Sequence, residues 1–132
     1  MAPNLGVFTM ENKKNIDMEK KELLEIAQEA FMEEGFELYA YEDKEDYEPD
    51  FFVKTYIKET DEEYMLPVFV ESSSTLKDEK NIQKIIETAK ECDFEGKSCI
   101  VVLPEKEKEN LENILKKEGL NQVVDIVDIP EE

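Results

Sequence analysis

Two short, almost uninterrupted apolar runs constrain the fold of this chain more than any other feature. They are Met65 to Val70 and Ser98 to Leu103. A strand with one face in water alternates polar and apolar residues, whereas runs of this kind are typical of strands that are covered on both faces. The sequence therefore predicts a sheet with helices packed against it.

Apolar residues at helical spacing mark three further segments. The first predicted helix follows Asp17, which is a suitable N-cap residue. The second begins near Thr75, which together with Asp78 resembles a capping box. The third takes Pro104 in its first turn and stops at Gly119.

Three more segments have the composition and pattern of strands. Phe36 to Tyr41 alternates in polarity, Phe51 to Ile57 is rich in β-formers, and Gln122 to Ile129 closes the chain. The first two, with Met65 to Val70, are expected to form an antiparallel meander. The element order is α-β-β-β-α-β-α-β without an internal repeat. It predicts an α/β fold with a single mixed sheet flanked by helices.

The length and composition favour one folded unit. The chain has 132 residues, 40% of them hydrophobic, which is enough for a core. We expect a flexible polar tail over residues 1–16 and a single α/β domain over residues 17–132. No apolar run approaches the roughly 20 residues that span a bilayer, and residues 1–9 lack the basic start of a signal peptide. The expected location is cytoplasmic, without membrane attachment.

The charge of the chain is strongly acidic. Asp and Glu number 35 against 16 basic residues, the net charge is −19, and every basic residue is lysine. Arginine is the residue best suited to forked recognition of phosphate and guanine. Its absence, with this net charge, argues against general binding of nucleic acid through the phosphate backbone. Two interpretations remain: a Glu/Lys-rich soluble surface, or an acidic surface that docks a basic partner.

Cys92 and Cys99 are the only cysteines, and histidine is absent. A structural zinc site needs more soft ligands than this, and cysteine–histidine or serine–histidine catalysis lacks its base. Two buried thiols in a reducing compartment are favoured over a disulfide, which stays open as the alternative.

One pair of motifs resembles a known family. Pro49 and Asp50 open the second predicted strand, and Glu71 ends the third, just before a helix. In order and spacing, residues 17–103 resemble the core of the restriction-endonuclease-like fold of PD-(D/E)xK nucleases and archaeal Holliday-junction resolvases. The resemblance implies that Asp50 and Glu71 converge on Mg²⁺ or Mn²⁺. Glu19, near the apolar face of the first helix, is the candidate for a third acidic ligand.

The chain departs from the family at the lysine of its acid-x-Lys triplet. The triplet that begins at Glu71 has Ser73 at that position. A hydroxyl carries no positive charge and is a poor base near neutral pH. Lys54 has the same strand parity as Asp50 and is the candidate for a relocated lysine, with Lys77 as a weaker one.

These features together predict a non-catalytic protein on a nuclease fold, acting through a protein partner or as a homo-oligomer, with no cofactor. The alternative is a Mg²⁺- or Mn²⁺-dependent nuclease that uses Asp50 and Glu71, with Lys54 as the relocated lysine.

The run Ser72 to Thr75 is expected to cap a helix rather than to bind an anion. Five tyrosines lie around the meander: Tyr39, Tyr41, Tyr47, Tyr56 and Tyr64. They are expected to be half-buried sheet residues whose hydroxyls contact solvent or, alternatively, to form an exposed recognition face.

Overall fold

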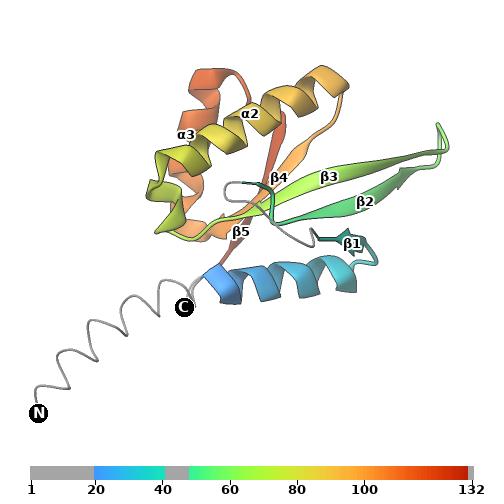
Figure 1. Cartoon of the computed structure of the whole chain (residues 1–132), viewed down its shortest axis with the longest axis horizontal. Helices are drawn as coiled ribbons and strands as arrows, with labels where there is room; N and C mark the ends of the chain where they lie inside the picture. The colour runs from blue at the N-terminus through green and yellow to red at the C-terminus, as the bar shows by residue number, and fades with distance from the viewer. Residues whose placement is uncertain (1–19, 41–47, 131–132) are drawn as a thin grey trace, which may run out of the picture.

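The computed structural model of the chain describes residues 20–40 and 48–130. This part contains one five-stranded sheet in which the strands follow the order β1-β2-β3-β4-β5 (Figure 1). The first three strands are antiparallel and the last three are parallel, so the sheet is mixed, as predicted. The strands are β1 (Glu37–Tyr39), β2 (Phe51–Ile57), β3 (Glu62–Val70), β4 (Cys99–Pro104) and β5 (Val124–Ile129).

Helices lie on both faces of the sheet (Figure 1). The first helix is described over residues 20–33 and covers one face. The helices α2 (Glu79–Glu95) and α3 (Lys108–Glu118) cover the other. Each follows a short 3₁₀ turn, η1 (Thr75–Lys77) or η2 (Glu105–Glu107). The expected tail over residues 1–16, the Asp17 cap and Glu19 lie outside the described residues.

The run Cys99–Leu103 and the second half of the other run, Pro67–Val70, are buried on both faces, because successive side chains of a strand point to opposite sides of the sheet. Met65, at the start of the predicted run, is 38% exposed. Phe69 and Val101 pack in the core formed with α2 and α3. Their neighbours Val68, Val70 and Val102 pack in the core beneath the first helix, and all three are 0% exposed. The prediction of strands covered on both sides is therefore confirmed for β4 and for the second half of β3, and is wrong for Met65.

The starts of the two later helices differ from the prediction. Asp78 does not form a box with Thr75; it caps α2 by accepting the Lys80 N–H at 2.9 Å. Thr75 instead pairs reciprocally with Ser72, whose Oγ accepts the Thr75 N–H at 3.2 Å while Thr75 Oγ1 accepts the Ser72 N–H at 2.8 Å. Pro104 is the last residue of β4 rather than part of a helix, with ψ of 144°. In both places a 3₁₀ turn precedes the α-helix and shifts its start.

Both cysteines are free and buried in the core that includes α2 and α3, in agreement with the favoured prediction. Burial raises the pKa of the Cys99 thiol to about 12 and, to a smaller extent, that of Cys92. Both thiols are therefore protonated and unreactive near neutral pH. None of the helices in the described part has the length and apolar character needed to cross a bilayer.

Candidate functional site

Asp50 lies at the start of β2, beside the end of β3. Its backbone N–H donates to the Val68 carbonyl oxygen at 2.8 Å. Its Oδ2 accepts the backbone N–H of Val70 at 2.7 Å, and its side chain is only 6% exposed. The register of β2 against β3 therefore fixes the position of this carboxylate, because Phe51 and Val68 are paired in the ladder.

Lys20 approaches Asp50 from the first helix. The Lys20 Nζ lies 3.3 Å from Asp50 Oδ1, and the lysine side chain is 29% exposed. Each oxygen of the Asp50 carboxylate thus already contacts a donor of the chain, one from β3 and one from the helix. Lys20 is not among the site residues predicted from the sequence. Its position could be inferred from helical spacing, because Lys20 precedes Leu23 by three residues and Ala27 by seven and so lies on the same face of the helix as these buried residues.

Glu71 directly follows Val70, the residue whose N–H binds Asp50. Its own N–H donates to the Val102 carbonyl oxygen at 2.9 Å, and the residue is 2% exposed. The structure thus brings Asp50 and Glu71 to the same end of the sheet. We refer to Asp50, Glu71, Lys20 and Ser73 as the Asp50 site.

Ser73 occupies the position of the lysine in the resembled family. Its Oγ is buried and has no hydrogen-bond partner within residues 20–40 and 48–130. The preceding Ser72 is committed to the capping interaction with Thr75. The serine segment after β3 therefore supplies no positive charge to the Asp50 site, and of its serine hydroxyls that of Ser72 accepts a backbone N–H.

Lys54 lies four residues further along β2 than Asp50, a distance of ~13 Å along the strand. Its Nζ forms ion pairs with Glu63 at 3.2 Å and with Glu37 at 3.8 Å. The hydrogen bond to Glu63 and the field of that carboxylate raise the pKa of Lys54, which keeps the ammonium protonated. The acids of the two neighbouring strands hold this cation, and a role for Lys54 beside Asp50 stays a prediction.

The tyrosines of the meander pair with nearby acids. Tyr64 is half-buried, as predicted, whereas Tyr39 is 42% exposed and Tyr56 54% exposed, which is more than the prediction implies. The hydroxyl of Tyr39 donates to Glu37, that of Tyr56 to Asp61, and that of Tyr64 to Glu62. These bonds to carboxylates raise the pKa of all three phenols. Tyr41 and Tyr47 lie outside the described residues.

A divalent cation at the Asp50 site would have to compete with the chain's own donors. Hard cations such as Mg²⁺ take oxygen ligands and prefer carboxylates that are open to them. Asp50 already binds an ammonium and an N–H group. In the part of the chain that the structure describes, no three His, Cys, Asp or Glu residues are grouped so that they could hold a metal ion. Glu19, the expected third ligand, lies outside that part.

The function of the chain has to be inferred from these residues. The end of the sheet carries two buried acids, one of them neutralised by Lys20, and the meander carries exposed tyrosines paired with acids. No protein-family model, no curated protein and no solved structure matches this chain.

Proposed function

We propose that this chain is a non-catalytic α/β domain on a nuclease-like scaffold and that it acts by binding another protein. The observation that carries the proposal is that the Asp50 carboxylate is buried and already bound by donors of the chain itself. A metal-dependent nuclease needs carboxylates that a divalent cation can reach. The Asp50 side chain is 6% exposed, and its two oxygens contact Val70 N–H and Lys20 Nζ.

The charges around the Asp50 site support the same proposal. Ser73 replaces the lysine that would position the attacking water. Lys20 is paired with Asp50, so its charge is already neutralised. With a net charge of −19 and no arginine, the chain repels a polyphosphate backbone rather than attracting it.

The surface supports an interaction with a basic partner. Phe94 is 93% exposed in the last turn of α2, and Asp93 and Glu95 flank it. An exposed aromatic side chain in an acidic stretch of sequence suits a partner that offers an apolar pocket with lysine or arginine at its rim. A second copy of the chain is a poorer partner, because two molecules of net charge −19 repel each other.

A cleavage assay tests the catalytic side of the proposal. The purified chain is incubated with duplex, branched and single-stranded DNA and with RNA, in millimolar Mg²⁺ or Mn²⁺. We expect no cleavage above the level of an Asp50→Ala variant. Cleavage by the wild-type chain that disappears in Asp50→Ala would refute the proposal.

A capture experiment tests the interaction side. Phe94→Ala removes the exposed aromatic group, and Met32→Ala is the matched control, since Met32 is 56% exposed on the first helix, across the sheet. We expect one basic protein to be retained by the wild-type and Met32→Ala chains, and to be lost or strongly reduced with Phe94→Ala. Equal retention by all three chains would show that Phe94 is not the docking residue.

A second candidate function is a Mg²⁺- or Mn²⁺-dependent nuclease. One observation favours it: the Asp50 carboxylate binds the residue directly before Glu71, so the two acids lie at one end of the sheet. Glu19 is the third acid of that proposal, and Lys20 rather than Lys54 is the cation beside Asp50. Calorimetric titration with Mn²⁺ separates the two functions, because saturable binding that Asp50→Ala abolishes is expected only of the nuclease.

A further inference from the structure

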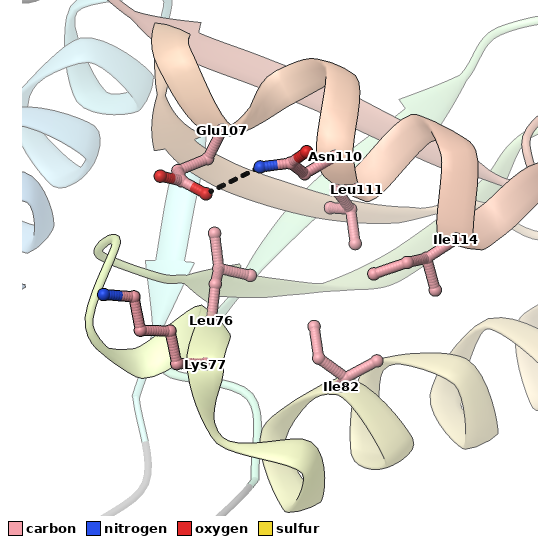
Figure 2. Close-up of a pocket in the computed structure, with 7 residues that line it drawn as sticks. All are labelled: Leu76, Lys77, Ile82, Glu107, Asn110, Leu111 and Ile114. Atoms are coloured by element: carbon pink, nitrogen blue, oxygen red, sulfur yellow. Dashed lines mark hydrogen bonds between the residues drawn. The ribbon is translucent and has the colours of Figure 1, made fainter.

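A cleft of about 280 Å³ lies between the two turns that follow β3 and β4 (Figure 2). It opens between η1 with the start of α2 on one side and η2 with the start of α3 on the other. The turns after β3 and β4 lie at the carboxyl ends of two neighbouring parallel strands. The cleft is lined by Leu76, Lys77, Ile82, Glu107, Asn110, Leu111 and Ile114.

One part of the cleft is purely aliphatic. The side chains of Leu76, Ile82, Leu111 and Ile114 converge on it from η1, α2 and α3 (Figure 2). Leu111 is 1% exposed, and the other three are half-buried at the edge of the core formed with α2 and α3. This part offers a branched aliphatic group a site out of water.

The other part of the cleft carries one charge of each sign. Lys77 projects from η1, while Glu107 and Asn110 lie across from it, with Asn110 Nδ2 donating to Glu107 Oε1 at 3.4 Å (Figure 2). Lys77 and Glu107 form no ion pair with each other or with another residue of the described part. The cleft therefore presents an ammonium and a carboxylate that are separate and both open to a ligand.

We propose that this cleft binds a free aliphatic α-amino acid of the leucine type. The ligand carboxylate meets Lys77, its ammonium meets Glu107, and its side chain enters the aliphatic part formed by Leu76, Ile82 and Ile114. The charge pattern favours a zwitterion, because only a ligand with both an ammonium and a carboxylate can pair with Glu107 and Lys77 at once. The volume suits an amino acid rather than a nucleotide or a larger cofactor. The site is independent of the function proposed for the Asp50 site.

Titration of the chain with L-leucine tests the proposal, with chemical shifts of the Leu and Ile methyl groups and calorimetry as readouts. We expect saturable binding with a Kd of about 1 mM or tighter, as is reasonable for a small ligand in a shallow site. N-acetyl-L-leucine lacks the ammonium, L-leucinamide lacks the carboxylate, and glycine lacks the side chain. Each should bind about fivefold more weakly or worse, since partly exposed charges contribute modestly.

Two variants assign the charges. Lys77→Met should weaken leucine but leave leucinamide unchanged, and Glu107→Gln should weaken leucine but leave N-acetyl-leucine unchanged. Lys116→Met and Glu109→Gln change exposed residues of α3 outside the cleft and serve as matched controls that bind like wild type. The proposal is overturned by the absence of saturable binding at high millimolar leucine. It is equally overturned if leucine, leucinamide and N-acetyl-leucine bind with the same affinity, because the cleft would then recognise only the aliphatic side chain.

Discussion

The Asp50 carboxylate is expected to act as a structural link between β2, β3 and the first helix, and its removal should destabilise the fold. Asp50→Ala deletes a charge-assisted hydrogen bond to Val70 N–H of 2.7 Å. Such bonds contribute about 1.5–3 kcal/mol when the partner is left buried. It also deletes the contact with Lys20, a partly exposed pair whose contribution is about 0.5–1 kcal/mol. We therefore expect a loss of about 3 kcal/mol in the free energy of unfolding.

Two further substitutions separate these contributions. Asp50→Asn keeps an oxygen that can accept from Val70 N–H but loses the charge, so its expected cost is about 1 kcal/mol. Lys20→Met leaves the carboxylate in place without its partly exposed cation and should cost about 1 kcal/mol. Lys21→Met is the matched control, because Lys21 is an exposed neighbour on the same helix and should change stability by less than about 0.5 kcal/mol.

Urea denaturation followed by circular dichroism measures all four variants, with and without millimolar Mn²⁺. A cation that binds the folded chain raises its stability by mass action, so Mn²⁺ should leave the wild-type midpoint unchanged if Lys20 holds Asp50. The reasoning is wrong if Asp50→Ala costs less than about 1 kcal/mol or if Lys20→Met behaves like Lys21→Met. Stabilisation by Mn²⁺ that requires Asp50 would instead make the carboxylate a metal ligand.

Three other predictions follow from packing, capping and ionisation. Because the pKa of Cys99 is raised from 9.0 to about 12, the unfolded thiol ionises first and stability should fall as the pH rises through that range. Urea denaturation at several pH values should show this slope, and Cys99→Ala should reduce it. Asp78→Ala removes the N-cap of α2 and should lower the free energy of unfolding by about 1 kcal/mol, as measured by thermal or urea denaturation. Ser74→Ala removes no capping bond and should leave the stability unchanged. Leu115→Ala empties a site that is 1% exposed and should cost about 2–5 kcal/mol by urea denaturation, while Ile26→Ala, at 46% exposure, should cost far less.

The sequence predicted the sheet better than it predicted the helix starts. Continuous apolar runs have one stable environment, the middle of a covered sheet, so β3 and β4 were identified with both faces buried. Capping depends on hydrogen bonds between residues a few positions apart, and the segment from Ser72 to Asp78 holds several side chains that can make them. The structure uses Ser72 with Thr75 for η1 and Asp78 for α2, which local pattern alone did not distinguish from a Thr75–Asp78 box.

The candidate site was predicted in part for a related reason. Asp50 and Glu71 could be placed at one end of the sheet because strand order and turn positions fix where each strand begins and ends. The partner of Asp50 could not be placed in the same way. The pair of Lys20 and Asp50 joins a helix to a strand thirty residues away in the sequence, and only the packing of the helix on the sheet brings them together. Lys54 shared strand parity with Asp50, but parity fixes the face of a strand and not the position along it.

The order of the strands in space is the same as their order along the chain. During synthesis, each of the five described strands can therefore join the edge left by the one before it, and none has to be inserted between two others. The meander of β1, β2 and β3 is complete before α2 is made. Apolar surface is most exposed after β4 has docked and before β5 pairs with it, because the apolar strand Cys99–Pro104 is then an unpaired edge of the sheet. A chain that stalls or is cut between β4 and β5 would present that edge to other molecules, and aggregation of such a fragment is the expected result.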